Sequence, residues 1–200
     1  LGRNLHRERF AGLRGKRWQA LADSPTWMAA QAKAVTTFAT PFWRAAGQSG
    51  NAFVRHPQAV LAEVFDCCDD LSGTRSSDVA RLPSGALGGF VALNAAQREP
   101  FRRSLPLLID SQLAQLYGVQ AQGGNLFLQD WATEPWTCST TDRAQPPEPP
   151  QANPLLRQPH WGSRLFFGGS ETAAHGAGHM EGALESADRI AHALVRGQAQ

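Results

Sequence analysis

One lysine of the sequence is a candidate for active-site chemistry. Among 19 Lys and Arg residues, only Lys16 and Lys33 are lysines. Lys33 lies in the segment 27–39, where Val35 and Thr37 would share its face of an extended strand, because side chains in a strand alternate between faces. The ammonium group of such a lysine either extends into solvent or donates hydrogen bonds inside a site. The residue type and spacing leave both roles open.

A glycine-rich stretch near the end of the sequence suits the binding of an anion or a polar ring. Residues 164–194 are typical of a short apolar strand, a turn and a helix. Glycine lets a backbone approach a ligand because it has no Cβ. The helix that follows would present free N–H groups and the positive end of its dipole. Glu171 beside the glycines would accept hydrogen bonds from sugar hydroxyls. The same pattern also suits a plain structural connection.

Two other clusters resemble metal sites, but neither completes a ligand set. Cys67 and Cys68 lie beside carboxylates without a second Cys or Cys/His pair. His175 and His179 have H-x-x-x-H spacing, but Gly176 stands where zinc proteases carry a glutamate. We therefore expect no metal. Three cysteines do not form a disulfide framework, and reduced thiols favour a cytoplasmic location.

Composition and charge exclude several classes of function. The sequence is 42% hydrophobic and 18% charged, as in globular proteins. It shows no signal peptide and no apolar run long enough for a membrane span, so we expect no membrane partner. Residues 1–17 hold six of the basic residues and one acidic residue, without an aromatic platform of the kind that nucleic-acid surfaces use. We expect no nucleic-acid binding. Because the sequence starts with Leu and its first 17 residues lack periodicity, we expect a piece of a longer protein.

The order of predicted elements indicates a mixed α+β fold. One helix should bury a face at three-to-four spacing and end at Gly118. A second should run from about His179 to Val195, and residues 140–154 should be a Pro-rich connection. Because strands and helices do not alternate regularly, we predict a mixed sheet. The predicted strands cover 27–39, 59–67, 85–93, 123–131 and 165–167, and the first helix buries Leu105, Ile109, Leu113 and Leu116.

Taken together, these segments resemble the flavin-containing amine oxidases, the monoamine and polyamine oxidase superfamily. The stretch GGSETAAHGAGHMEGALESADRIA is similar to the C-terminal flavin-binding motif of that family. TWMAAQAKAVTTFATPFWRAAGQSG resembles the segment that ends in Pro-Phe-Trp-Arg, and SGALGGFVALNAAQ, LLIDSQLAQLYG, LQDWATEPWT and LRQPHWGSRLFFGGSETA follow in the family's order. The family's G-x-G-x-x-G turn, which holds the ADP half of FAD, is absent, and GALGGF has a different glycine spacing. The sequence therefore resembles a C-terminal portion.

The resemblance implies a domain organisation and a function. It implies a basic, non-matching start over 1–17, part of a substrate domain over 18–135, and over 136–200 the strand–helix return of a Rossmann-like FAD domain whose N-terminal part is absent. The activity implied is FAD-dependent oxidation of an amine to an imine or aldehyde with release of H2O2, with this chain inactive alone. Two alternatives stay open: a non-catalytic remnant or subunit that needs a partner with the G-x-G-x-x-G half, and an amino-acid oxidase relative.

The resemblance also assigns roles to individual residues. Lys33, eleven residues before Arg44, matches the active-site lysine that holds a water near the flavin N5. Met180 matches the residue whose backbone N–H faces the flavin pyrimidine carbonyl. The other cofactor-binding positions are Gly169, Ser170, Glu171 and Thr172 in the turn, and Trp131 and Trp136 beside the isoalloxazine. For both tryptophans ordinary core packing is the alternative.

The sequence departs from the family at the substrate and at the covalent flavin position. His179 stands where many relatives have a tyrosine of an aromatic cage, and the opposite wall falls near Thr140 or Thr141. A protonated histidine there would repel a cationic amine. Cys138, counted from Trp131, lies two residues short of the cysteine that binds flavin covalently in some relatives. We therefore predict non-covalent FAD and an altered amine site.

Overall fold

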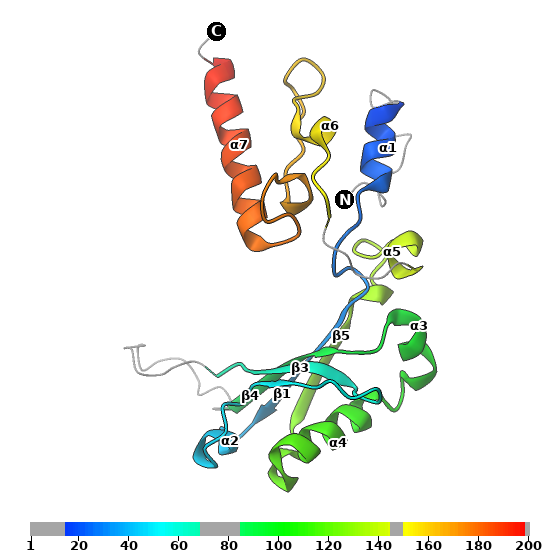
Figure 1. The fold of residues 1–200 in the computed structure, drawn as a ribbon, viewed down its shortest axis with the longest axis vertical. Coiled ribbons are helices and arrows are strands. Elements are labelled where there is room, and N and C mark those ends of the chain that lie inside the picture. Colours follow the sequence, from blue (N-terminus) through cyan, green and yellow to red (C-terminus); the bar gives the residue numbers. More distant parts are fainter. Residues whose placement is uncertain (1–14, 69–84, 145–149, 199–200) are drawn as a thin grey trace. The chain divides into compact units, whose positions relative to one another are not determined.

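A computed structural model describes residues 15–68, 85–144 and 150–198 of the chain (Figure 1). It forms two compact units, a sheet unit of Gln31–Trp131 and a helical unit of Leu1–Ala30 with Ala132–Gln200. The elements of the sheet unit are β1 Ala32–Phe38, α2 Phe42–Ala45, β2 Ala52–Phe53, β3 Leu61–Asp66, β4 Gly85–Val91, α3 Ala95–Arg98, η3 Glu99–Phe101, α4 Leu105–Tyr117, η4 Val119–Ala121 and β5 Asn125–Asp130. The 3₁₀ turn η5 Trp131–Thr133 follows β5. The elements of the helical unit are α1 Lys16–Asp23, α5 Thr140–Ala144, α6 Pro154–Arg157, η6 Ser170–Thr172 and α7 Met180–Gln198.

The five strands form one antiparallel sheet in the order β2-β3-β4-β1-β5. The α+β class and the strands expected near 59–67, 85–93 and 123–131 are confirmed. The sheet is antiparallel rather than mixed, because every strand pairs only with neighbours that run the opposite way. The central strand is β1, which brings its residues between β4 and β5.

Three predicted boundaries differ from the structure. The first strand begins at Ala32 rather than at residue 27, because Met28 adopts φ 63° in a turn. The strand expected over 165–167 is absent, since Leu165 forms a single bridge with His160 and pairs with no strand among the described residues. The connection expected over 140–154 begins as the short helix α5.

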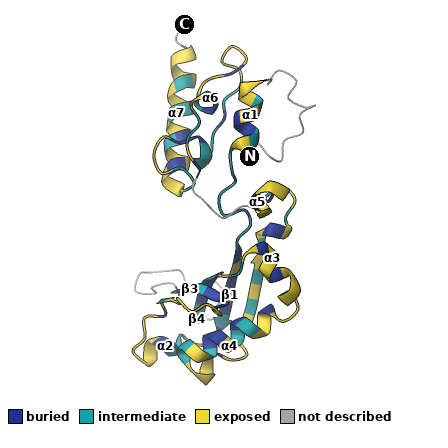
Figure 2. Cartoon of the chain, turned by 45° about the vertical axis from the view of Figure 1, so that its right-hand side comes forward, coloured by how far each residue is buried: buried dark blue, intermediate teal, exposed yellow. Residues whose placement is uncertain are grey.

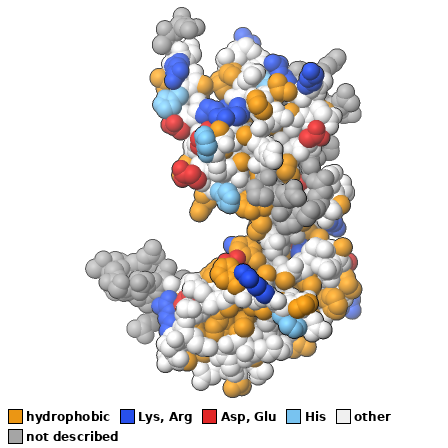
Figure 3. Space-filling view, viewed as in Figure 1, with side chains coloured by type: hydrophobic (Ala, Val, Ile, Leu, Met, Phe, Trp, Pro, Cys, Tyr) orange, Lys and Arg blue, Asp and Glu red, His pale blue; other side chains and the backbone are white. Residues whose placement is uncertain are grey.

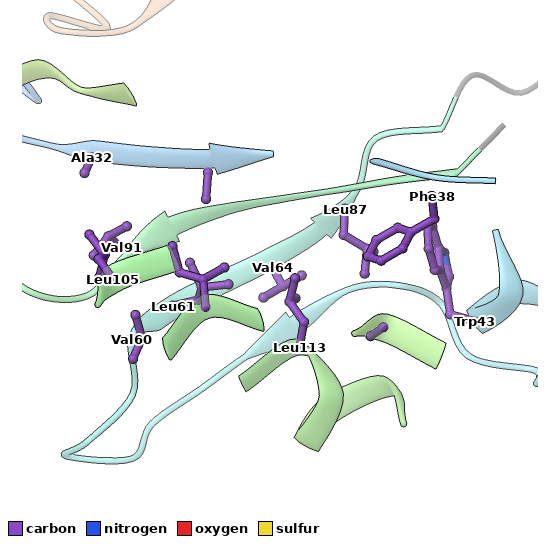
Figure 4. Close-up of a cluster of buried hydrophobic side chains, with 13 residues drawn as sticks. Ala32, Phe38, Trp43, Val60, Leu61, Val64, Leu87, Val91, Leu105 and Leu113 are labelled. Carbon is purple, nitrogen blue, oxygen red and sulfur yellow. The ribbon is translucent and has the colours of Figure 1, made fainter. Parts of the chain in front are cut away.

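One face of the sheet is buried under α4 (Figure 4). Ala32, Ala34, Thr36 and Phe38 point into this core from β1, as the period-two rule requires. From α4, Leu105, Ile109 and Leu113 are buried as predicted, and Leu116 is partly buried. The helix has Pro106 in its first turn and ends at Gly118, whose φ of 89° suits glycine. The core thus matches the helical and strand periodicities of the sequence.

A buried amide fastens α4 to the sheet. The Gln112 Oε1 accepts hydrogen bonds from the N–H groups of Val60 and Leu61 at 2.6 and 2.9 Å. Its Nε2 donates to the Leu61 carbonyl at 2.8 Å. These bonds satisfy backbone groups at the start of β3 that have no water available to them. The helix and β3 are therefore held in one register.

Two ion pairs fix the edges of the sheet unit. The buried guanidinium of Arg98 donates to both carboxylate oxygens of Asp130 at 2.9 and 2.5 Å, at the end of β5. Near α2, Asp66 accepts from Arg44 Nε at 2.6 Å and from Trp43 Nε1 at 2.9 Å. Burial raises the pKa of Asp66, but these donors and the Cys68 N–H lower it by more, so its pKa lies well below the usual range. Asp66 is therefore ionised at neutral pH.

The helical unit has a smaller core. Its buried hydrophobic cluster consists of Ala20, Leu21, Leu156 and Phe167. His160 is 1% exposed beside Phe167, and neither ring nitrogen has a hydrogen-bond partner among the described residues. Burial, with a smaller effect of the Arg17 charge, lowers the pKa of His160, so the neutral ring is favoured. The histidine acts here as an apolar core residue.

The long helix α7 buries a side that its apolar pattern does not indicate. Its buried residues are Gly182 and Ser186, while Met180 is 88% and Leu184 66% exposed. Most of α7 is exposed in Figure 2. In Figure 3 acidic, basic and histidine side chains gather along it beside hydrophobic ones. The apolar side, which we call the α7 stripe, has no covering surface among the described residues and consists of Met180, Ala183, Leu184, Ala187, Ala191, Leu194 and Val195.

Candidate functional site

Lys33 lies on the open face of the sheet, opposite the core. The strand register places it between Phe90 of β4 and Gln129 of β5, and Glu63 of β3 is the next residue in this row. The Lys33 Nζ lies 4.8 Å from the centroid of the Phe90 ring and 5.9 Å from that of Phe65. No carboxylate of the described residues forms an ion pair with it. The ammonium donors therefore remain available to a ligand or water.

The glycine-rich turn over residues 168–178 of the helical unit, which we call the glycine bend, is held to α7 by a polar network. The Ser186 Oγ accepts from the Gly169 N–H at 3.1 Å and lies 2.9 Å from the Thr172 Oγ1. Arg189 donates to both hydroxyls and to the Phe167 carbonyl. Ser186 is fully buried, so this network links the bend to the helix away from solvent. The predicted turn residues Gly169 and Thr172 thus owe their positions to two side chains of α7.

Close packing explains three glycines of this region. A Cβ on Gly182 would lie 2.2 Å from the Gly176 carbonyl oxygen, and one on Gly168 would lie 2.9 Å from Ile190 Cδ1. At Gly178, φ is 82° and a Cβ would lie 2.5 Å from the Trp27 ring. These glycines let the bend, α7 and Trp27 approach one another. They serve the packing of the chain itself, as expected for the other interpretation of this pattern, a plain structural connection.

The carboxylate of Glu185 also holds the glycine bend in place. Glu185 accepts from the N–H groups of Ala174 and His175 at 2.6 and 3.3 Å and pairs with Arg157 at 3.0 Å. Desolvation raises the pKa of Glu185, but the two N–H groups and the Arg157 charge lower it by more. Glu185 is thus an ionised structural residue. By contrast, Glu171 has no hydrogen bond or ion pair within the described part of the chain, so its carboxylate can face a ligand.

Met180 opens α7, as the motif predicted. The first N–H groups of a helix have no acceptor within it, and Met180 is almost fully exposed. Ser170 and Glu171 lie in η6, immediately before the turn that leads to this helix start. Both belong to the helical unit together with Gly169 and Thr172. The structure therefore brings the predicted turn residues and the helix start into one local assembly.

The aromatic partner of His179 is Trp27, which the sequence analysis did not single out. The two ring centroids are 4.5 Å apart with an interplanar angle of 71°, an edge contact. Thr141 is exposed on α5 and offers no ring. Trp27 lies in TWMAAQAK, a segment that resembles the family, and this place in the sequence could have drawn attention to it. Its contact with His179, however, depends on the fold. An indole beside an imidazole is the aromatic surface at this position.

The remaining predicted residues are less closely tied to a site. Trp131 ends the sheet unit and is 42% exposed, and Trp136 lies in the helical unit at 79% exposure. Neither is a core residue in the described part of the chain. Cys138 is buried with its Sγ near the Ser139 carbonyl. A thiol in this position is not presented to a ligand.

The predicted residues fall in both units. Lys33 and Trp131 belong to the sheet unit, and the bend, Met180, His179, Thr141 and Trp136 belong to the helical unit. The sheet unit also has an open cavity of about 660 Å³ at the ends of β1 and β5, lined by Thr37, Phe42 and Asn125 among others. None of the predicted site residues lines it. Their roles in binding stay predictions.

Two negative findings concern the described residues. No group of three His, Cys, Asp or Glu side chains there is placed to hold a metal ion. Among the helices of residues 15–68, 85–144 and 150–198, none has the length and apolar content of a membrane span.

A lysine on the open face of a sheet, and a glycine bend before a long helix, are features that the resemblance to the flavin-containing amine oxidases implied. Residues 4–195 match the pattern of the flavin containing amine oxidoreductases, and the chain belongs to that family. The match begins within the basic segment that the sequence analysis set apart. The members of this family use FAD.

Individual relatives cover most of this chain but only part of their own length. The probable flavin-containing monoamine oxidase A of Dictyostelium discoideum is 30% identical over 164 residues, 79% of this chain and 32% of that protein. The flavin-containing amine oxidase B of the dog, Canis lupus familiaris, is 28% identical over 177 residues, 82% of this chain and 30% of that protein. The chain thus spans about a third of the length of these relatives.

Solved structures show the same fold. Cyclohexylamine oxidase from Brevibacterium oxydans matches with a TM-score of 0.64 at 18% identity, over 92% of this chain and 38% of that one. Putrescine oxidase bound to putrescine matches with a TM-score of 0.60 at 24% identity, over 83% and 35%. At such identities the likeness concerns the fold alone. The chain therefore has the fold of part of an amine oxidase.

Proposed function

We propose that the chain is the C-terminal portion of an FAD-dependent amine oxidase and acts only with the rest of that fold. Family membership supports the chemistry, and the coverage of about a third of its relatives supports an incomplete enzyme. The observation that carries the proposal is Lys33, whose ammonium lies on the open sheet face against aromatic rings instead of in an ion pair. The sheet unit would contribute Lys33, and the glycine bend would bind the flavin.

The residues of the bend fit the flavin end of FAD. The Glu171 carboxylate is free of protein partners in the described residues and would accept hydrogen bonds from hydroxyl groups of the cofactor. The Met180 N–H, at the positive end of the α7 dipole, would donate to the pyrimidine carbonyl. When bound, FAD supplies the redox chemistry by which a hydride equivalent leaves the carbon beside the amine and electrons pass to oxygen.

The protein side chains would bind, orient and exclude water. The Lys33 ammonium would hold a water near the flavin N5, which requires free N–H donors. His179 and Trp27 would form the aromatic wall toward the amine. The buried Cys138 supports non-covalent binding of the cofactor.

The α7 stripe supports the need for further protein surface, which a separate chain or a preceding domain would supply. Contiguous exposed apolar surface usually marks an interaction site. Leu194 and Val195 extend the stripe from Met180 along the whole helix, at 49% and 68% exposure. A partner with the G-x-G-x-x-G half would serve as well as a preceding domain of the same polypeptide. Both versions predict the same active assembly.

The test compares the chain alone with the chain joined to a dinucleotide-binding part. Residues 1–200, mixed with FAD and passed through gel filtration, should lose the yellow cofactor and release no peroxide from a panel of amines. Fused behind the preceding part of the dog amine oxidase B, the chain should retain FAD and release peroxide with at least one amine. Yellow, active protein from the chain alone would contradict the need for a partner.

A lysine pair provides the control for the chemistry. In the active fusion, Lys33→Met should lower turnover about 10²-fold, the scale of a lost proton-transfer or water-positioning group. Lys16→Met, which removes the other lysine, should leave turnover unchanged. A fusion that retains FAD but oxidises only amino acids would identify an amino-acid oxidase relative. A folded fusion without FAD would identify a non-catalytic remnant.

A further inference from the structure

The Lys33 ammonium lies on two aromatic rings that come from two different strands. Phe90 is its direct cross-strand neighbour on β4. Phe65 belongs to β3, which is separated from β1 by the whole of β4. Its ring nevertheless reaches to 5.9 Å from the Lys33 Nζ, within the range of about 6 Å at which an ammonium is attracted by a ring face. A side chain on the intervening strand would normally fill this space.

Gly88 is the residue that leaves the space open. The register places Gly88 directly between Phe65 of β3 and Val35 of β1 on the open face. A Cβ at Gly88 would lie 2.5 Å from Cε2 of the Phe65 ring and 2.7 Å from the Cys67 Sγ. The Phe65 ring therefore lies across β4 over the bare backbone of this glycine. It also meets the Phe90 ring, at 5.8 Å between centroids.

Phe90 separates Lys33 from the nearest acidic residue in its row. Glu63 is paired with Phe90, and Phe90 with Lys33, so Phe90 lies between the acidic residue and the lysine. A ring face attracts the charge of the ammonium without fixing its N–H groups, whereas a carboxylate would accept hydrogen bonds from them. The contact thus holds the end of the side chain and leaves its donors free.

We propose that Gly88 is a positioning residue for Lys33: the missing side chain lets Phe65 lie across β4 and form, with Phe90, a two-ring cradle for the ammonium. The catalytic meaning of the cradle rests on the proposed function, in which the ammonium holds a water. The cradle itself is a property of the sheet unit. It can be tested without cofactor or substrate.

The test uses the small number of lysines in the chain. Reductive methylation with ¹³C-formaldehyde labels Lys16, Lys33 and the terminal amine while keeping their positive charge, and Lys16→Arg assigns the signals. Protons over a ring face are shifted upfield by its ring current. In the folded chain the Lys33 methyl signal should therefore lie upfield of its position in urea, while the Lys16 signal should not. Equal positions in the folded and denatured chain would overturn the proposal.

The variants separate Gly88 from the rest of the face. Gly88→Ala should remove the part of the upfield shift that Phe65→Leu removes, because both changes take the Phe65 ring away from the ammonium. Phe127→Leu is the matched control, since Phe127 is an exposed phenylalanine on the same face of β5 and does not lie over the ammonium. Its change should leave the signal in place. If only Phe90→Leu moves the signal, Gly88 has no positioning role.

The functional consequence is measured in the active fusion. Gly88→Ala should lower kcat with little change in KM for the amine and with unchanged FAD content, since the ammonium would be misplaced and not lost. A normal kcat together with the altered methyl signal would overturn the catalytic meaning of the cradle. An inactive wild-type fusion with an intact upfield signal would instead refute the proposed function and leave the cradle standing. The two failures are thus distinguishable.

Discussion

The sheet unit and the helical unit bury their apolar side chains in different ways. The sheet unit covers one face of its sheet with α4 and leaves no large part of that face to solvent. The helical unit has a four-residue cluster, a buried histidine and a long helix whose apolar side is exposed. The first unit carries its own core, whereas the second is organised mainly by polar contacts around Ser186 and Arg189. Within the described residues, the helical unit thus carries apolar surface that its own core does not cover.

The strongest test of this comparison is the buried amide of the sheet unit. Gln112→Leu removes the partner of two backbone N–H groups and one carbonyl, each of which costs about 1–3 kcal/mol when left buried and unpaired. We expect the free energy of unfolding of the sheet unit to fall by about 4 kcal/mol. Hydrogen exchange of β3 and α4 peptides measures the loss.

Gln115→Leu is the matched control, because Gln115 lies on the exposed side of the same helix. It should leave the exchange of β3 unchanged. Faster exchange confined to the helical unit after Gln112→Leu would contradict the independence of the two cores.

Two leucines compare the units directly. Leu113 is 1% exposed in the core and Leu184 is 66% exposed on the α7 stripe. Leu113→Ala should cost about 2–5 kcal/mol, as cavity-forming changes do. Leu184→Ala should stay within about 0.5 kcal/mol, as at other surface positions. Urea unfolding followed by unit-resolved hydrogen exchange measures both.

An equal loss for both leucines would show that the α7 stripe is covered in the isolated chain, for instance by a second copy. In the proposed assembly with the dinucleotide-binding part, the Leu184→Ala cost should rise, because the stripe would then be buried. That change sharpens the comparison further.

The smallest expected effect is a difference in acid sensitivity. The pKa of His160 is lowered in the folded chain, mainly by burial, so the unfolded chain binds the proton more readily. The contribution of the neutral ring to stability is therefore present above the unfolded pKa of about 6.5 and is lost as the pH falls below it. The slope is at most about 1.4 kcal/mol per pH unit.

His160→Phe should remove this pH dependence from the helical unit. Thermal unfolding between pH 5 and 8, read by exchange in α6 and α7, measures it. The sheet unit should respond only at lower pH, where Asp66 is protonated. A helical unit with the same stability at pH 5 and 7 would contradict the role of His160.

The sequence predicted those elements whose stabilising contacts are local or follow a simple period. The helix α4 and the strands β3 to β5 are examples. In α4, Leu105, Ile109 and Leu113 repeat at the helical period and are buried. The family motif also located Lys33 and the bend with its helix start. These features depend on residues close together along the chain.

The rest depends on contacts that a single sequence does not reveal. The buried side of α7 consists of Gly182 and Ser186, small residues that carry little weight in an apolar pattern but permit close approach. The strand expected over 165–167 needs a pairing partner, and none lies among the described residues. The contacts of Lys33 with Phe65 and of Trp27 with His179 require the register of the sheet and the packing of the bend.

The exposed apolar side of α7 has a consequence for the amount of the protein that accumulates in a cell. Chaperones bind such surfaces, and proteases remove chains that keep them uncovered. In the proposed version with a separate partner chain, a copy that fails to meet that partner would be cleared, and the amount that accumulates would follow the supply of the partner. The helix would in this way set the stoichiometry of the pair without any regulator of gene expression.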